Sequence, residues 1–132
     1  MKKSLFILIL CLLTFVGCQH KKSDLTEPKT SIQLIDSVWS FGQIQSSSHA
    51  ISFTFQVKNT GQAPLVLRDL TTTCGCVKLK SYTHSPIPPN GLGYISVKFD
   101  PKKSAKGFVN KKVEIHSNAF NFVEATVTGY VE

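Results

Sequence analysis

Hydrophobic and polar residues alternate with a period of two in three stretches of this chain, residues 49–58, 92–100 and 120–130. Such a period buries one face of a β-strand and leaves the other face in water. Shorter apolar runs at 64–67 and 113–115 predict further strands. Because no stretch after residue 31 has a helical period, we expect an all-β protein.

Turn-forming residues separate the apolar stretches at nearly even spacing. Roughly seven short strands in about 100 residues are typical of a β-sandwich. A small β-barrel is the competing architecture, because the same alternation fits it. Trp39 and Phe41 are large aromatics two positions apart, and we expect them to anchor the core between the sheets.

The N-terminal region has a different pattern. Lys2 and Lys3 precede an apolar run over residues 4–16, which is too short to span a bilayer, and Gly17 then precedes Cys18. This order predicts a secretory signal over residues 1–17. The Gly17-Cys18 junction resembles the lipobox of bacterial lipoproteins, although Phe15 departs from its commonest form. The resemblance implies cleavage before Cys18 and a lipid on its thiol.

Residues 18–31 are polar and lack an apolar period, so we expect a flexible tether there and a folded domain over residues 32–132. Thirteen tether residues after Cys18 would reach about 20 Å. Removal of the signal leaves 13 basic and 8 acidic side chains, a formal charge of +5. Because an exported protein rarely meets nucleic acid, we expect no nucleic-acid partner, and this positive charge suits anionic envelope surfaces.

Only two cysteines, Cys74 and Cys76, belong to the predicted domain, because Cys11 lies within the signal and Cys18 is the lipid site. Three interpretations of the Cys74-Gly75-Cys76 motif stay open. The thiols can close a strained and reducible disulfide, which an oxidising compartment permits and Gly75 helps to form. They can hold a soft metal such as Cu(I). They can also simply pack at the end of a strand.

A family resemblance is carried by six short segments, residues 39–44, 55–61, 64–65, 73–76, 87–91 and 97–101. Together they resemble a bacterial family of unknown function whose members are exported, often lipid-anchored and share a Cys-Gly-Cys motif. That family is similar to the immunoglobulin-like domains of Hydin and ASPM, and more distantly to major sperm protein and pilus chaperones. The resemblance implies an immunoglobulin-like sandwich, for which the pattern above gives about seven antiparallel strands, and it does not imply an enzyme, because no activity is attached to the family.

Lysines concentrate around one predicted hairpin. They form a candidate contact for anionic lipid or polysaccharide, or they protect a strand edge from aggregation. These residues are Lys98, Lys102, Lys103, Lys106, Lys111 and Lys112.

The sequence contains no recognisable nucleophile–base pairing, phosphate loop or histidine-rich metal run. We therefore expect no catalytic residues, no metal site, no cofactor and no small-molecule substrate. The leading hypothesis is a non-enzymatic lipoprotein that faces the periplasm and acts as an interaction or scaffolding module for an envelope protein. The lipid on Cys18 would hold it to the inner or outer membrane. The alternative is a thiol redox or copper-handling protein that works through Cys74 and Cys76.

Overall fold

The computed structural model describes residues 30–132, so the predicted signal, the Cys18 lipid site and most of the tether lie outside the described residues. The described part contains eight strands and one short 3₁₀ helix. In chain order they are β1 (Ile32–Leu34), β2 (Val38–Ile44), β3 (Ile51–Asn59), β4 (Leu67–Thr72), β5 (Val77–Tyr82), β6 (Leu92–Phe99), η1 (Pro101–Lys103), β7 (Gly107–Ser117) and β8 (Val123–Val131).

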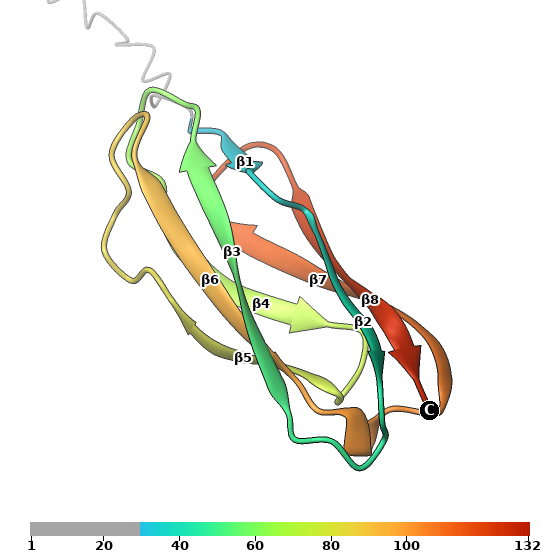
Figure 1. The fold of residues 1–132 in the computed structure, drawn as a ribbon. Coiled ribbons are helices and arrows are strands. Elements are labelled where there is room, and N and C mark those ends of the chain that lie inside the picture. Colours follow the sequence, from blue (N-terminus) through green and yellow to red (C-terminus); the bar gives the residue numbers. More distant parts are fainter. Residues whose placement is uncertain (1–29) are drawn as a thin grey trace, which may run out of the picture.

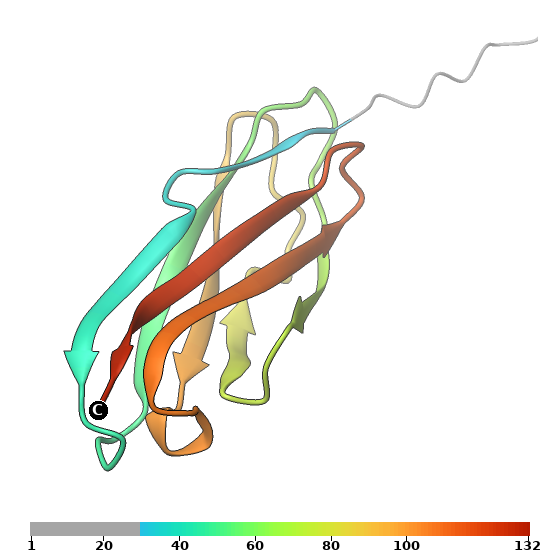
Figure 2. The ribbon, with the colours of Figure 1, turned by 90° about the vertical axis from the view of Figure 1, so that its right-hand side faces the viewer.

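The strands form two four-stranded sheets packed face to face, as Figures 1 and 2 show. Sheet A has the order β1-β3-β6-β5, and sheet B has the order β2-β8-β7-β4. The predicted β-sandwich is therefore confirmed. The described domain has eight strands where about seven were expected, because the polar segment that forms β5 gives a weak sequence signal.

The N-terminal strand crosses from one sheet to the other. β1 pairs antiparallel with β3, and after Ile35–Ser37 the chain continues as β2, which pairs parallel with β8. The amide of Ile35 donates to the carbonyl of Gln56 on the sheet A side (3.0 Å), and Ser37 accepts from Thr126 on the sheet B side (2.7 Å). One pair of strands is thus parallel, where the sequence predicted only antiparallel strands.

The core lies between the inward faces of the sheets, and aromatic stacking joins them. Trp39 on β2 stacks on Phe53 of β3, with ring centroids 4.9 Å apart. Phe41 stacks on Phe99 of β6, with centroids 4.6 Å apart. The predicted role of Trp39 and Phe41 as anchors between the sheets is confirmed.

A buried amide closes the end of the sandwich where the described chain begins. The Asn59 side chain is fully buried. Its Oδ1 accepts from the Thr30 hydroxyl (2.8 Å) and the Gly61 amide (2.9 Å), and its Nδ2 donates to the carbonyls of Ala63 (2.7 Å) and Ile87 (2.9 Å). Thr30 is itself buried. The sequence placed Thr30 in the tether, whereas the structure packs it into the domain.

The two ends of the sandwich are distinct. The first end, at which Thr30 enters, contains the β3–β4, β5–β6 and β7–β8 connections, and we call it the entry end. The opposite end contains the β2–β3 and β4–β5 connections, η1 and the C-terminus, and we call it the distal end. Within residues 30–132, no helix has the length and apolarity that crossing a membrane requires.

Candidate functional site

The Cys-Gly-Cys motif forms the connection between β4 and β5 at the distal end. The two sulfur atoms are joined in a disulfide, with a Cα–Cα distance of 5.2 Å. This spacing is shorter than the roughly 6.5–7 Å of two residues across an extended strand, because the chain turns at residues 73–76. The amide of Cys76 donates to Sγ of Cys74 (3.0 Å), and the amide of Val77 donates to the Cys74 carbonyl (3.2 Å).

The two cysteines differ in exposure. Cys74 is half-buried beside exposed Thr73 and Gly75, whereas only 1% of Cys76 is exposed. Cys76 also lines a hollow of about 180 Å³ on the outer face of sheet A. The other lining residues are Lys78, Lys98, Asp100 and Lys103.

The register of β5 and β6 explains why these residues meet. Lys78 lies directly opposite Lys98, and the amide of Asp100 donates to the Cys76 carbonyl (2.8 Å). Cys76 directly precedes β5 and Asp100 directly follows β6, so this bond joins the two strand ends beside the Lys78–Lys98 pair. Lys103 reaches this group from η1. Lys78 was not identified from the sequence, because only the strand pairing brings it to Lys98.

The structure divides the predicted lysine group among several surfaces. Lys98 lies on the outer face of sheet A, whereas Lys112 lies on the outer face of sheet B and pairs with Glu124 at 2.6 Å. Lys111 has the spacing of the inward residues Val109 and Val113 of β7 and is half-buried. Lys102 and Lys103 belong to η1, and Lys106 precedes β7. These six lysines therefore do not form one continuous contact.

Two of the described histidines contact side chains other than those of the cysteines. His116 contacts the Thr71 hydroxyl at 2.9 Å, and His84 packs against the Tyr82 ring. Among residues 30–132, no group of three or more histidine, cysteine, aspartate or glutamate side chains is placed to hold a metal ion.

Side chains cover the edge of sheet A at β1. The Asn121 side chain donates to the Ile32 carbonyl (2.7 Å) and accepts from the Ile32 amide (3.0 Å) and the Ser31 hydroxyl (3.1 Å). The Asn121 amide thus occupies hydrogen-bonding groups that another strand would use. The sequence did not reveal this contact, because asparagine in a turn has no distinguishing pattern.

The neighbouring edges at β4 and β5 are also protected. The Tyr82 hydroxyl donates to the Arg68 carbonyl (2.9 Å), and the Thr72 hydroxyl donates to the Val77 carbonyl (3.1 Å). The β5 ladder is irregular around Lys80. Bulges and lysines are common means of preventing strands from pairing with other chains.

The edge at β2 differs from the other three. β2 contains no charged residue, and none of the described side chains bonds to its outer backbone. Val38, at the start of this edge, is 58% exposed, and Ile35, in the crossover that precedes β2, is 49% exposed. A register shift after Ser40 and a positive φ of 70° at Gly42 limit the regular ladder to the first half of β2.

A family model described as "Protein of unknown function (DUF1573)" matches residues 32–131. The chain belongs to the DUF1573 family. The family resemblance read from the short motifs is confirmed at this level. No curated protein matches the chain.

Solved structures are similar to this DUF1573 domain in fold alone. A protein of unknown function from Porphyromonas gingivalis W83 is 18% identical with a TM-score of 0.67, covering 83% of this chain and 51% of that one. The chain thus spans about half of that protein's length. The human CEP192 ASH/PapD-like domain 7 is 10% identical (TM-score 0.62; 88% and 96% covered). The YadV chaperone is 10% identical (TM-score 0.52; 77% and 52% covered).

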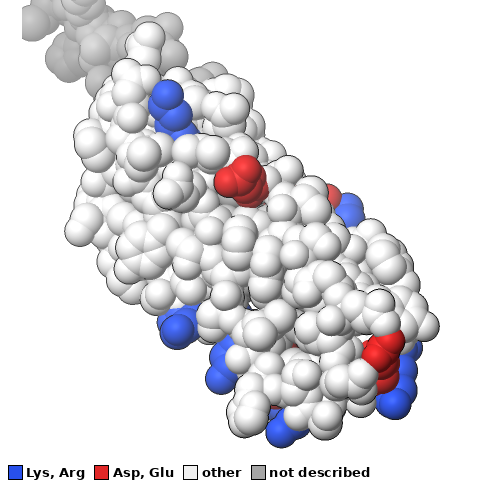
Figure 3. Space-filling view, in the orientation of Figure 1, with Lys and Arg blue, Asp and Glu red and all other residues white. Residues whose placement is uncertain are grey.

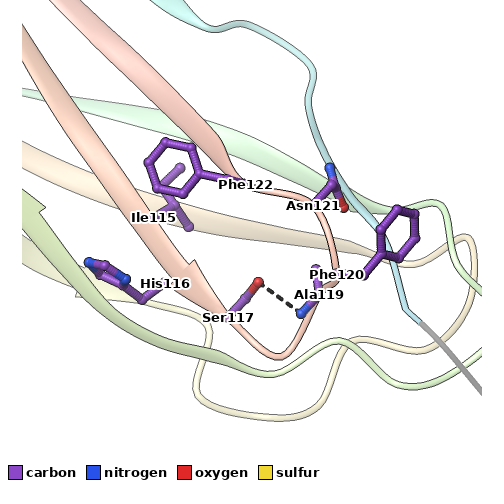
Figure 4. Close-up of a pocket in the computed structure, with 7 residues that line it drawn as sticks. All are labelled: Ile115, His116, Ser117, Ala119, Phe120, Asn121 and Phe122. Carbon is purple, nitrogen blue, oxygen red and sulfur yellow. Dashed lines mark hydrogen bonds between the residues drawn. The ribbon is translucent and has the colours of Figure 1, made fainter. Parts of the chain in front are cut away.

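The entry end of the DUF1573 domain exposes two aromatic side chains. Phe120 and Phe122, in the β7–β8 connection, are 72% and 61% exposed. They flank Asn121 beside a hollow of about 160 Å³, as Figure 4 shows. The amide of Phe120 donates to the Thr30 carbonyl (3.1 Å), so Phe120 lies next to the point at which the chain enters the domain, whereas the Phe122 ring lies nearer to Ile115 of β7.

Proposed function

We propose that this DUF1573 protein is a non-enzymatic, lipid-anchored module of the bacterial envelope that docks an extended segment of a partner protein on β2. The observation that carries the docking is the contrast among the four sheet edges. Side chains or irregularities protect β1, β4 and β5, whereas the first half of β2 is regular, uncharged and open. An exposed strand edge presents unpaired backbone groups that can pair with another chain.

The surface around β2 suits an uncharged partner segment. Exposed Ile35 and Val38 would contact apolar side chains of the added strand. Charged side chains are sparse over the middle of the face that Figure 3 shows, which includes β2 and β3. A segment with alternating apolar residues and few charges therefore fits this edge best.

The proposed anchor is the Cys18 thiol, with the chain from Cys18 to Thr30 as its link to the domain. The exposed aromatics of the entry end support an orientation with this end toward the bilayer. Burial of Phe120 and Phe122 at a membrane interface would contribute on the order of 2–4 kcal/mol. The cysteine pair and the lysines around it, at the distal end, would then face the periplasm.

Labelling with a palmitate analogue tests the anchor. We expect label in the wild-type protein and none in Cys18→Ala. Label that persists in this variant would contradict the assignment.

Site-specific photocrosslinking in the native envelope tests the docking edge. A crosslinker at position 40 on β2 should give a discrete adduct that Val38→Lys abolishes, because a lysine there opposes strand addition. A crosslinker at exposed Leu92 on sheet A is the matched control. Identical adducts from positions 40 and 92, or an adduct unaffected by Val38→Lys, would refute docking on β2.

Fluorescence quenching tests the orientation. Phe122→Trp in lipidated protein should be quenched by brominated lipids, whereas Phe108→Trp should not. Phe108 is a fair control because it is at least as exposed as Phe122 (72% against 61%) and lies at the start of β7, at the distal end. Trp39 is retained in both variants, so their difference reports the added tryptophan. Equal quenching at both positions would refute the orientation.

A further inference from the structure

We propose that the Cys74–Cys76 disulfide is a thiol–disulfide exchange site, in which an external thiol attacks Cys74 and Cys76 leaves as a thiolate. The ligand class is a small thiol or a dithiol of a partner protein. This activity is independent of strand docking on β2, and either proposal can fail without the other.

The exposure of the two sulfur-bearing residues determines which one is attacked. An incoming thiolate must approach along the S–S axis, on the side opposite the leaving sulfur. Cys74 is half-exposed on the outside of the turn, whereas Cys76 is 99% covered. Access therefore favours attack at Cys74.

The lysines around Cys76 favour its departure. Lys78, Lys98 and Lys103 line the same hollow as Cys76, and Asp100 is the one carboxylate there. One oxygen of Asp100 accepts from the backbone amide of Lys102 (3.2 Å), at the start of η1. Positive charge near a thiolate stabilises it, and a more stable thiolate leaves a disulfide faster.

Stability of the fold does not explain this arrangement of lysines. Like charges directly opposite each other on neighbouring strands destabilise a sheet, and Lys78 faces Lys98 in this way. The strands of sheet A contain four lysines and no aspartate or glutamate, whereas the strand carboxylates of the described domain all lie in sheet B. A negative charge that forms at Cys76 would relieve the repulsion.

The exchange balances as two successive displacements. A first thiolate forms a bond to Cys74 Sγ, the Cys74–Cys76 bond breaks, and its electron pair stays on Cys76. A second thiolate attacks the external sulfur of this mixed disulfide and releases an external disulfide together with the Cys74 thiolate. Two external thiols are thus oxidised and the protein disulfide is reduced. The Cys76 amide, 3.0 Å from Cys74 Sγ, is placed to donate to the Cys74 thiolate that the second displacement releases.

Single-cysteine variants test the direction of attack. Full-length Cys76→Ser retains Cys74, and Cys74→Ser retains Cys76. Each is mixed with the neutral probe 2,2′-dithiodipyridine. We expect Cys74 to react at least about tenfold faster than Cys76, because of its exposure. Equal rates or the opposite order would overturn the assignment of Cys74 as the attacked sulfur.

Reduction of the folded wild-type protein tests the exchange and the role of the lysines. Dithiothreitol should reduce the disulfide without loss of β structure, as followed by intact mass after alkylation. Reduction should be at least about threefold slower in Lys78→Gln/Lys98→Gln. The control Lys106→Gln/Lys112→Gln, which loses the same charge elsewhere, should match the wild type. Lys98→Gln alone provides the comparison if the double variant does not fold.

Two results would overturn the proposal. A disulfide that resists excess dithiothreitol until urea unfolds the chain would show that the bond is only structural. Equal rates of reduction in both lysine variants and the wild type would show that Lys78 and Lys98 do not favour the departure of Cys76.

Discussion

Replacement of Asn59 by alanine removes a buried amide that bonds to three segments of the chain, at Thr30, in the β3–β4 connection and at Ile87. Its side chain bonds to Thr30, Gly61, Ala63 and Ile87, with all four distances between 2.7 and 2.9 Å. Each such bond contributes about 1 kcal/mol, and a buried carbonyl left without a donor costs about 1–3 kcal/mol. Because water can reach part of this end of the domain, we expect a total loss of about 3–4 kcal/mol.

Urea unfolding, followed by circular dichroism, measures this loss. For a slope of about 1.5 kcal/mol per molar urea, the midpoint should fall by about 2 M. Asn118→Ala is the matched control, because the Asn118 side chain makes two bonds at an exposed site, to the Val66 amide and the Pro64 carbonyl. It should lose no more than about 1 kcal/mol. A loss in Asn59→Ala that is no larger than in Asn118→Ala would refute the reasoning.

Three further outcomes follow from the packing. Gly129→Ala should lower the free energy of unfolding by about 1–3 kcal/mol, because an added Cβ would overlap the Phe41 ring; a urea midpoint equal to that of the wild type would contradict this. Asn121→Ala should speed hydrogen exchange at the Ile32 amide, which loses its acceptor, and unchanged exchange would exclude this protection of the β1 edge. The Glu124 carboxylate on β8 raises the pKa of Lys112 above its usual value of 10.5, mainly through its hydrogen bond. The stabilisation from this exposed pair should therefore be present at neutral pH and disappear as pH rises above 10.5 through the raised pKa. NMR titration of the Lys112 side chain should show a lower pKa in Glu124→Gln than in the wild type. An unchanged titration would exclude the pairing of these two side chains.

The alternation of apolar and polar residues predicted the architecture, because successive side chains on a strand point to opposite faces of the sheet. Phe53, Phe55 and Val57 face the core on β3, and Ile95, Val97 and Phe99 do so on β6, as their spacing of two predicted. β5 was not predicted, because Lys78 and Lys80 alternate with few strongly apolar residues along an edge strand. The parallel pairing of β2 was also not predicted, because it depends on the crossover between the sheets.

The candidate sites also combine features that the sequence shows with features that depend on strand pairing. Cys74 and Cys76 stand out locally, since a Cys-Gly-Cys motif is unusual in a sandwich of this size. The surroundings of Cys76 depend on residues distant in sequence, because β5 pairs with β6 and η1 follows β6. No local pattern connects Lys78 to Lys98. The open edge at β2 likewise becomes visible only when side chains are found to cover the other three edges.

The sequence by itself determined the β-sandwich, the inward positions of most strands, the aromatic anchors Trp39 and Phe41 and the isolated cysteine pair. These features depend on periodicity and residue type, which short stretches of chain carry. Tertiary structure alone decided the division of the lysines between two faces, the buried contacts of Asn59, the protection of β1 by Asn121 and the hollow beside Cys76. Each of these depends on strand register, and register is set by the packing of the whole sandwich.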